Sequence, residues 1–178
     1  MRPLRATAGR TNLSFEFELK GASIDVRAAD LIHEPCSIAR SLSFLGDAWT
    51  LIVLRQAFMG TRRFEDFHAE LGLSRSILAD RLTVLVDVGI LRREPYRDAI
   101  RTRDQYRLTE KGIELYPVLR ALAAWGDTYL AEDGPFVLYR HRSCGGASEV
   151  VHRCAACGDQ LTARDVEFEP GPGVSAAA

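Results

Sequence analysis

Long apolar runs are missing from this sequence, and cysteine is scarce. No stretch approaches the ~20 consecutive apolar residues that a membrane-spanning helix needs. The Arg-bearing N-terminus lacks the apolar centre of a signal peptide. The four Cys fall as one near the start and three close together near the end, which is not the framework of a disulfide-stabilised secreted domain. We therefore expect a cytoplasmic protein that does not contact a membrane.

Residue sets typical of common enzymes are also missing. No Ser-His-Asp arrangement, pair of catalytic carboxylates or Gly-rich phosphate loop is apparent. The four His, at positions 33, 68, 141 and 152, are not spaced as a catalytic zinc set. The sequence therefore argues against an enzyme. The formal net charge is only −1, so diffuse attraction to nucleic acid should be modest.

Three successive apolar stripes with helical spacing occupy residues 48–89. The first predicted helix covers 48–58 and ends at Gly60, and the second begins near Arg63 and closes at Gly72. Ser74 is in the preferred N-cap position of the third, which Gly89 terminates. Only residues 72–74 join the last two helices, a spacing typical of a helix-turn-helix.

A charged hairpin is predicted directly after the third helix. Residues 90–93 and 105–108 alternate apolar and polar positions around a stretch rich in Arg, REPYRDAIRTRD. From Arg55 to Arg107 there are eleven Arg against eight acids, a balance of +3, which leaves −4 for the rest of the chain. This order of elements predicts a winged helix, in which the second helix of the motif enters the major groove of DNA and the wing contacts the backbone. The alternative is that the Arg only solvate a surface.

The stretch from Cys36 to Trp125, about half of the chain, resembles the HxlR-type winged-helix transcriptional regulators, relatives of the MarR class. The motifs that carry the resemblance are CSIARSLSFLGDAWTLIVLRQAFMGTRRFEDF, SRSILADRLTVLVDVGILRR, YRLTEKG and the later WGD. One departure is Ser37, where the family usually has Pro. The resemblance implies a homodimer that binds double-stranded DNA at a short inverted repeat near a promoter, most simply as a repressor. Residues 111–130 and 38–45 should form its dimer interface.

Candidate DNA contacts follow from this frame. Ser74 should cap the recognition helix, and Arg75 and Ser76 lie exposed in its first turn. Arg81, one turn on, either contacts DNA or forms an ion pair within the domain. In the wing, Arg101 and Arg103 are closer to the tip than Arg92 and Arg93, so they are better candidates for phosphate or minor-groove contacts.

Three of the four Cys gather in the tail with a spacing typical of zinc ligands. The first motif is His141-x-x-Cys144-Gly and the second is Cys154-x-x-Cys157-Gly, with nine residues between Cys144 and Cys154. This spacing predicts a structural zinc knuckle with a closed His-Cys-Cys-Cys set, and His152 is a competing fourth ligand. Two alternatives remain, a redox-active Cys154–Cys157 pair and thiols without metal. The knuckle could also be a protein-interaction module for which the winged helix is only a scaffold.

Cys36 is separate from that group. In some members of the resembling family, the Cys at this position senses oxidants or electrophiles, so the resemblance implies a candidate redox sensor. A thiol at a helix N-terminus is favoured in its reactive form, yet Cys is also a common small buried residue. An oxidant or a small molecule is therefore the expected kind of effector.

The expected fold class is mainly α with a small β wing (α+β), and four segments are expected. Residues 1–35 form an extension, either a small hairpin pairing 13–19 with 24–26 or a flexible segment. Residues 36–134 form the winged helix-turn-helix and dimerisation domain. Residues 135–168 form a small zinc-ribbon-like β appendage, and residues 169–178 a flexible tail. No internal repeat is apparent.

Overall fold

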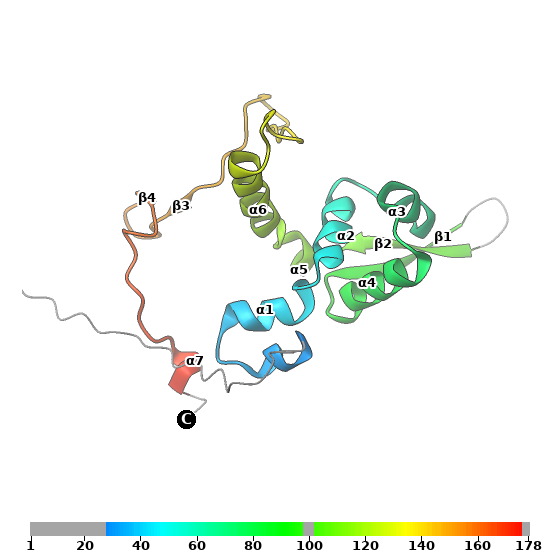
Figure 1. The fold of residues 1–178 in the computed structure, drawn as a ribbon, viewed down its shortest axis with the longest axis horizontal. Helices are drawn as coiled ribbons and strands as arrows, with labels where there is room; N and C mark the ends of the chain where they lie inside the picture. The colour runs from blue at the N-terminus through cyan, green and yellow to red at the C-terminus, as the bar shows by residue number, and fades with distance from the viewer. Residues whose placement is uncertain (1–27, 98–101, 176–178) are drawn as a thin grey trace, which may run out of the picture.

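A computed structural model describes residues 28–97 and 102–175 of the chain. A 3₁₀ helix, η1 (Ala28–His33), leads into α1 (Ser37–Leu45), α2 (Ala48–Phe58), α3 (Phe64–Leu71) and α4 (Arg75–Asp87). The hairpin of β1 (Leu91–Arg97) and β2 (Thr102–Leu108) follows, then α5 (Glu110–Ile113) and α6 (Tyr116–Tyr129). The tail holds β3 (His152–Arg153), β4 (Gln160–Leu161) and α7 (Pro172–Ser175) (Figure 1).

The three predicted helices of the helix-turn-helix region are confirmed. Asp47 caps α2 by accepting bonds from the backbone N–H groups of Trp49 and Thr50, at 2.9 and 3.3 Å. Gly72 ends α3 with a φ of 64°, a left-handed conformation that favours glycine. Ser74 caps α4 by accepting a bond from the N–H of Ile77 at 3.3 Å. The turn between α3 and α4 is therefore encoded locally.

The core lies where α2, α3 and α4 meet the start of the hairpin. Its fully buried side chains come from each of these elements: Val53, Leu54, Phe67, Leu78, Leu82, Leu85, Ile90 and Leu91. The ring of Tyr106 in β2 meets that of Phe67 edge to face, with centroids 6.3 Å apart. This packing fixes the orientation of α4 and the point at which the hairpin begins.

The hairpin is longer than the sequence predicted. β1 and β2 pair antiparallel from Leu91↔Leu108 out to Arg97↔Thr102, so Pro95 and Tyr96 are strand residues and not part of a loop. A proline is tolerated there because a two-stranded hairpin has only edge strands. The predicted tip residue Arg101 lies outside the described residues.

Two helices, α5 and α6, follow the hairpin in place of one continuous helix. Pro117 lies in the first turn of α6, where its missing N–H costs nothing. Thr109 caps α5 and also donates to the carbonyl of Gly89 at 2.6 Å. A Cβ at Gly112 would lie 2.2 Å from the carbonyl oxygen of Ile90, so this close approach requires glycine.

Near the two ends of the chain, the structure describes only some of the residues for which a prediction was made. The predicted hairpin of residues 13–19 with 24–26 lies outside the described residues. Within the expected extension, residues 28–33 form η1, which packs against α1. In the expected flexible tail, residues 172–175 form the short helix α7.

Candidate nucleic-acid interface and C-terminal cysteine turns

The first turn of α4 presents Arg75 in a defined position. The guanidinium of Arg75 makes two hydrogen bonds to the carboxylate of Glu65 in α3, at 2.6 and 2.8 Å. It also lies over the ring of Phe64, 5.0 Å from the ring centroid. Both partners of the ion pair are exposed. A paired, stacked guanidinium has few accessible rotamers, so the pair orients Arg75 at the surface.

Ser74 and Ser76 lie beside it at the surface. Their hydroxyl oxygens are 3.2 Å apart, and Ser74 also accepts the capping bond of α4. Ser74 is thus engaged in the fold of the helix, whereas within the described residues the hydroxyl of Ser76 makes only this mutual bond.

A hollow of about 460 Å³ opens between α3, the start of α4 and the wing. Three Arg and three acids line it together with two aromatic rings: Arg63, Arg75, Arg103, Glu65, Asp66, Asp104, Phe64 and Tyr96. Arg63 lies over the ring of Tyr96, 4.7 Å from the centroid, and so joins the wing to the helix-turn-helix. Arg103 is half-buried here, turned towards α3. The structure therefore brings Arg75 and Arg103 to one surface.

Sequence reasoning missed Arg63. It occupies the N-cap position of α3 and pairs with Gln105 in an isolated β-bridge. The only signal was its place directly before the apolar stripe of α3, which could not show that the wing folds back beside it.

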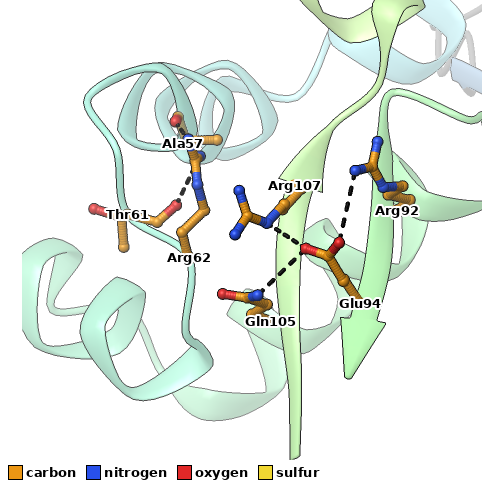
Figure 2. A network of polar contacts seen from close by, with 7 residues as sticks. All are labelled: Ala57, Thr61, Arg62, Arg92, Glu94, Gln105 and Arg107. Carbon is orange, nitrogen blue, oxygen red and sulfur yellow. Dashed lines mark hydrogen bonds and ion pairs between the residues drawn. The ribbon is translucent and has the colours of Figure 1, made fainter. Parts of the chain in front are cut away.

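The base of the wing is held by a different set of charges. Figure 2 shows Glu94 of β1 accepting from Arg107 of β2 and, at 3.3 Å, from Gln105, with Arg92 at 3.8 Å. Arg62 donates to the carbonyl oxygen of Ala57 at 2.8 Å and so satisfies the end of α2. Because Glu94 offsets the charge of Arg92 and Arg107, the base of the wing offers less free positive charge than its composition suggests.

Arg81 is placed inside the domain. Its guanidinium lies 3.3 Å from the carboxylate of Asp47, the residue that caps α2, and its side chain is mostly buried. The geometry supports the structural alternative that the sequence left open, an ion pair between α4 and the start of α2.

Helix α6 has two unlike faces. Leu115 and Leu119 pack against the core, whereas Val118, Leu122, Trp125 and Tyr129 form a stripe of large exposed apolar side chains, with exposures from 46% to 69%. In α1, Ile38 and Leu42 are also exposed, at 72% and 43%. We call the four residues of α6 the apolar stripe.

Arg120 lies on the inner side of α6 and is only 7% exposed. Its guanidinium stacks on the ring of Tyr139, 3.5 Å from the centroid, and donates to the carbonyl of Ser148 at 3.4 Å. Its Nε and Nη1 atoms have no hydrogen-bond partner among the described residues. Arg120 thus connects α6 to the beginning of the tail, beside a hollow of about 600 Å³ that α2 also lines.

The tail contains two turns with the same backbone hydrogen bonds. In the first, the N–H of Gly145 donates to the carbonyl of His141, and the N–H of His141 to the carbonyl of Gly146, both at 2.8 Å. In the second, the N–H of Gly158 donates to the carbonyl of Cys154, and the N–H of Cys154 to the carbonyl of Asp159, both at 2.9 Å. The two turns are related by a shift of thirteen residues, a repeat that inspection of the sequence missed.

Side chains and flanking pairings repeat as well. Arg140 donates to the carbonyl of Gly145 at 3.1 Å, and Arg153 to that of Gly158 at 3.2 Å. The bridge Arg140↔Ala147 has its counterpart in Arg153↔Gln160. The glycines Gly145 and Gly158 have φ of 71° and 79°, which explains why both turns need glycine after the Cys.

Each turn brings one predicted ligand pair together. Nδ1 of His141 is 3.2 Å from Sγ of Cys144. In the other turn, the backbone N–H groups of Cys157 and Ala156 hold the pKa of the Cys154 thiol below its ordinary value. The two pairs are apart from each other, and the described part of the chain contains no group of three or more metal-binding side chains (Figure 1).

Cys36 is exposed at the N-cap of α1, where its side chain makes no capping hydrogen bond. Its thiol is therefore accessible in the single chain. The role of Cys36 as an oxidant sensor, like the existence of an effector, stays a prediction.

Comparison with known proteins identifies the family to which this chain belongs. Residues 44–134 match the model of the HxlR-like helix-turn-helix family. The chain belongs to this family, and it is a transcriptional regulator of the helix-turn-helix type, not an enzyme. The predicted winged helix-turn-helix fold is thereby confirmed.

The similarity to individual relatives extends beyond residues 44–134. The uncharacterized HTH-type transcriptional regulator Rv3095 of Mycobacterium tuberculosis is 43% identical over 151 residues, covering 83% of this chain and 95% of the relative. Because 83% of 178 residues is about 148, the aligned stretch extends past residue 134 wherever it begins. The crystal structure of PA1607, a candidate transcription factor, is 34% identical, with a TM-score of 0.72 over 80% of this chain and 99% of that one.

No single helix among the described residues has the length and apolar composition to cross a membrane. The helices α1 and α2 have that length and composition only when they are taken together, and the pair is bent by 81°.

The pair of Glu65 and Arg75 should make stability depend on pH. The hydrogen bond from Arg75 lowers the pKa of the Glu65 carboxylate. The pair therefore stabilises the fold at pH values above the ordinary pKa of Glu, and this stabilisation is lost as the pH falls through the lowered pKa. Urea unfolding should show Glu65→Gln to be slightly less stable than the wild type at neutral pH, because the pair is exposed, with the small difference vanishing on acidification. Glu70→Gln, on the same helix, is the control. A difference independent of pH would contradict the assignment.

Proposed function

We propose that the protein is a homodimeric repressor that binds an inverted-repeat operator, with α4 in the major groove and the wing on the adjacent backbone. The observation that carries the proposal is the surface on which Arg75, held by Glu65, lies beside Arg63 and Arg103. A guanidinium has five N–H donors, and Glu65 accepts from Nη1 and Nη2, so DNA would be contacted through the N–H groups that remain. A guanidinium already fixed in place loses less entropy on binding.

The near-neutral net charge of the chain limits how tightly one copy of this surface would bind DNA. The whole chain carries only −1, and the three Arg of this surface lie among three acids, so a single copy of it should bind DNA weakly and without sequence preference. Two such surfaces in a dimer, spaced by about one helical repeat of ~34 Å, would engage two half-sites together and restore affinity. Specificity then depends on the geometry of the dimer as well as on base contacts.

Arg75→Ala should weaken operator binding by about 1–3 kcal/mol, roughly 5- to 150-fold in Kd, if Arg75 contacts a base edge. Fluorescence anisotropy on the operator and on random duplex over a series of salt concentrations measures this. Arg164→Ala, which removes the same charge from the exposed tail, is the matched control and should leave binding unchanged.

The salt titration distinguishes a base contact of Arg75 from a phosphate contact. A loss confined to the operator assigns Arg75 to base reading, whereas an equal loss on every duplex with a salt slope reduced by about one assigns it to phosphate contact. If the wild-type protein prefers no promoter fragment over random duplex, the repressor proposal fails, and the alternative of a scaffold for a protein-interaction module is favoured.

The apolar stripe of α6 supports the dimer. Four large apolar side chains at helical spacing, all about half exposed or more, form a continuous surface that water solvates poorly. The opposite face of the same helix packs on the core, so the stripe faces away from the domain. A second copy of α6, together with the exposed residues of α1, would cover it. Movement at such an interface would change the distance between the two α4 helices and so the operator affinity.

Leu122→Arg should convert the dimer to a monomer, because it places a charge in the middle of the apolar stripe. Light scattering coupled to gel filtration measures the mass, and operator affinity should fall in parallel. Thr83→Arg, at an exposed position of α4, adds the same side chain outside the stripe and should remain dimeric. A monomeric wild-type protein, or a Leu122→Arg variant of unchanged mass, would overturn the assignment of this interface.

A further inference from the structure

We propose that His141, Cys144, Cys154 and Cys157 bind one Zn²⁺, and that the metal closes residues 139–161 into a zinc ribbon at the end of α6. This site lies outside the DNA-binding domain and does not depend on how the protein contacts DNA.

The repeated turn is the main support for the site. Each turn has a ligand, two intervening residues, a second ligand and a glycine with positive φ, with the same backbone hydrogen bonds, the same preceding Arg and the same strand pairing. Two such turns are what a tetrahedral site needs, because each offers two side chains on one side of a tight loop. Both turns share the pattern of an Arg, a ligand, two residues, a Cys and a Gly, and this pattern places one pair of metal-binding side chains in each turn.

The repeat also decides which His completes the set. Under the shift of thirteen residues His141 corresponds to Cys154, and Cys144 to Cys157. His152 corresponds to Tyr139, two residues before the turn, so it does not occupy a ligand position. In the first turn His141 is already 3.2 Å from the Cys144 sulfur, close enough for both to reach one metal ion after a small adjustment.

Chemistry of the ligands favours zinc. Three thiolates and one neutral imidazole form a closed Cys₃His set, which is typical of structural zinc and leaves no open position for catalysis. Most side chains of residues 135–168 are exposed, so the segment buries too little apolar surface to be stable alone. Binding free energy of the metal would supply that stability.

Closure requires the second turn to move towards the first. Residues 148–151 join the two turns without regular secondary structure, so they can bend. The first turn is the fixed half, because Arg120 stacks on Tyr139 and donates to the carbonyl of Ser148. A hollow of about 820 Å³ beside Cys144, lined by Tyr116 and by the first turn, leaves room for the second turn. The closed ribbon would then be attached to α6 through Arg120.

Thiol counting tests the site with an internal reference. All four Cys of the chain are free, and Cys36 lies outside the proposed site. Native protein treated with iodoacetamide should gain one adduct per chain when zinc is bound and four after chelation, as measured by mass spectrometry of the intact chain. Zinc content measured on the same sample should be one ion per chain. Four adducts before chelation, or a wild-type protein without zinc after growth in zinc-supplemented medium, would overturn the proposal.

Variants then separate the ligands from their neighbours. Cys154→Ser and His141→Ala should each lose zinc, whereas His141→Cys, which supplies another thiolate, should keep it. His152→Ala is the matched control and should also keep one zinc per chain. Loss of zinc from His152→Ala with retention in His141→Ala would overturn the assignment of the fourth ligand. Because the core of the winged helix excludes the tail, the circular dichroism of all variants should remain helical.

Discussion

The structure depends first on the burial of one face of α4 against α2 and α3. Leu78, Leu82 and Leu85 are fully buried there, and the chain leaves α4 directly into Ile90 and Leu91, which are buried in the same core. Burial of this kind contributes roughly 1.5–3 kcal/mol per large side chain. Both parts of the candidate DNA surface, the first turn of α4 and the wing, are therefore oriented by a single core. A loss of packing in this core would displace both at once.

Ion pairs orient the Arg side chains on the elements that the core positions. Three acids are each paired with Arg, in the pairs Glu65–Arg75, Asp47–Arg81 and Glu94–Arg107, and each pair joins two elements of the domain. Exposed pairs contribute little to stability, so their main effect is on side-chain orientation. Arg81 and Arg107 are thereby engaged in holding the domain together, whereas Arg75 is oriented by Glu65 but stays at the surface. Composition alone does not separate these roles.

Helix α6 connects the parts of the molecule that carry the proposals. Its inner face packs on the core, its outer face is the apolar stripe, and Arg120 reaches the first turn of the tail. A dimer formed through the stripe and a zinc ribbon attached at Arg120 would thus act on the same helix. Any change in the tail would be transmitted to the dimer geometry through a rigid element, and that geometry sets the spacing of the two α4 helices.

The sequence by itself determined the local elements: the helices from apolar periodicity, their ends from Ser74 and Gly72, and the two cysteine turns from ligand and glycine spacing. These features involve residues a few positions apart, so pattern alone carries them. Tertiary structure decided which Arg are paired, that Arg63 joins the wing, and that Arg120 holds the tail to α6. Those contacts join residues far apart in the chain, and their partners are chosen by the packing of the whole domain, which no local spacing encodes.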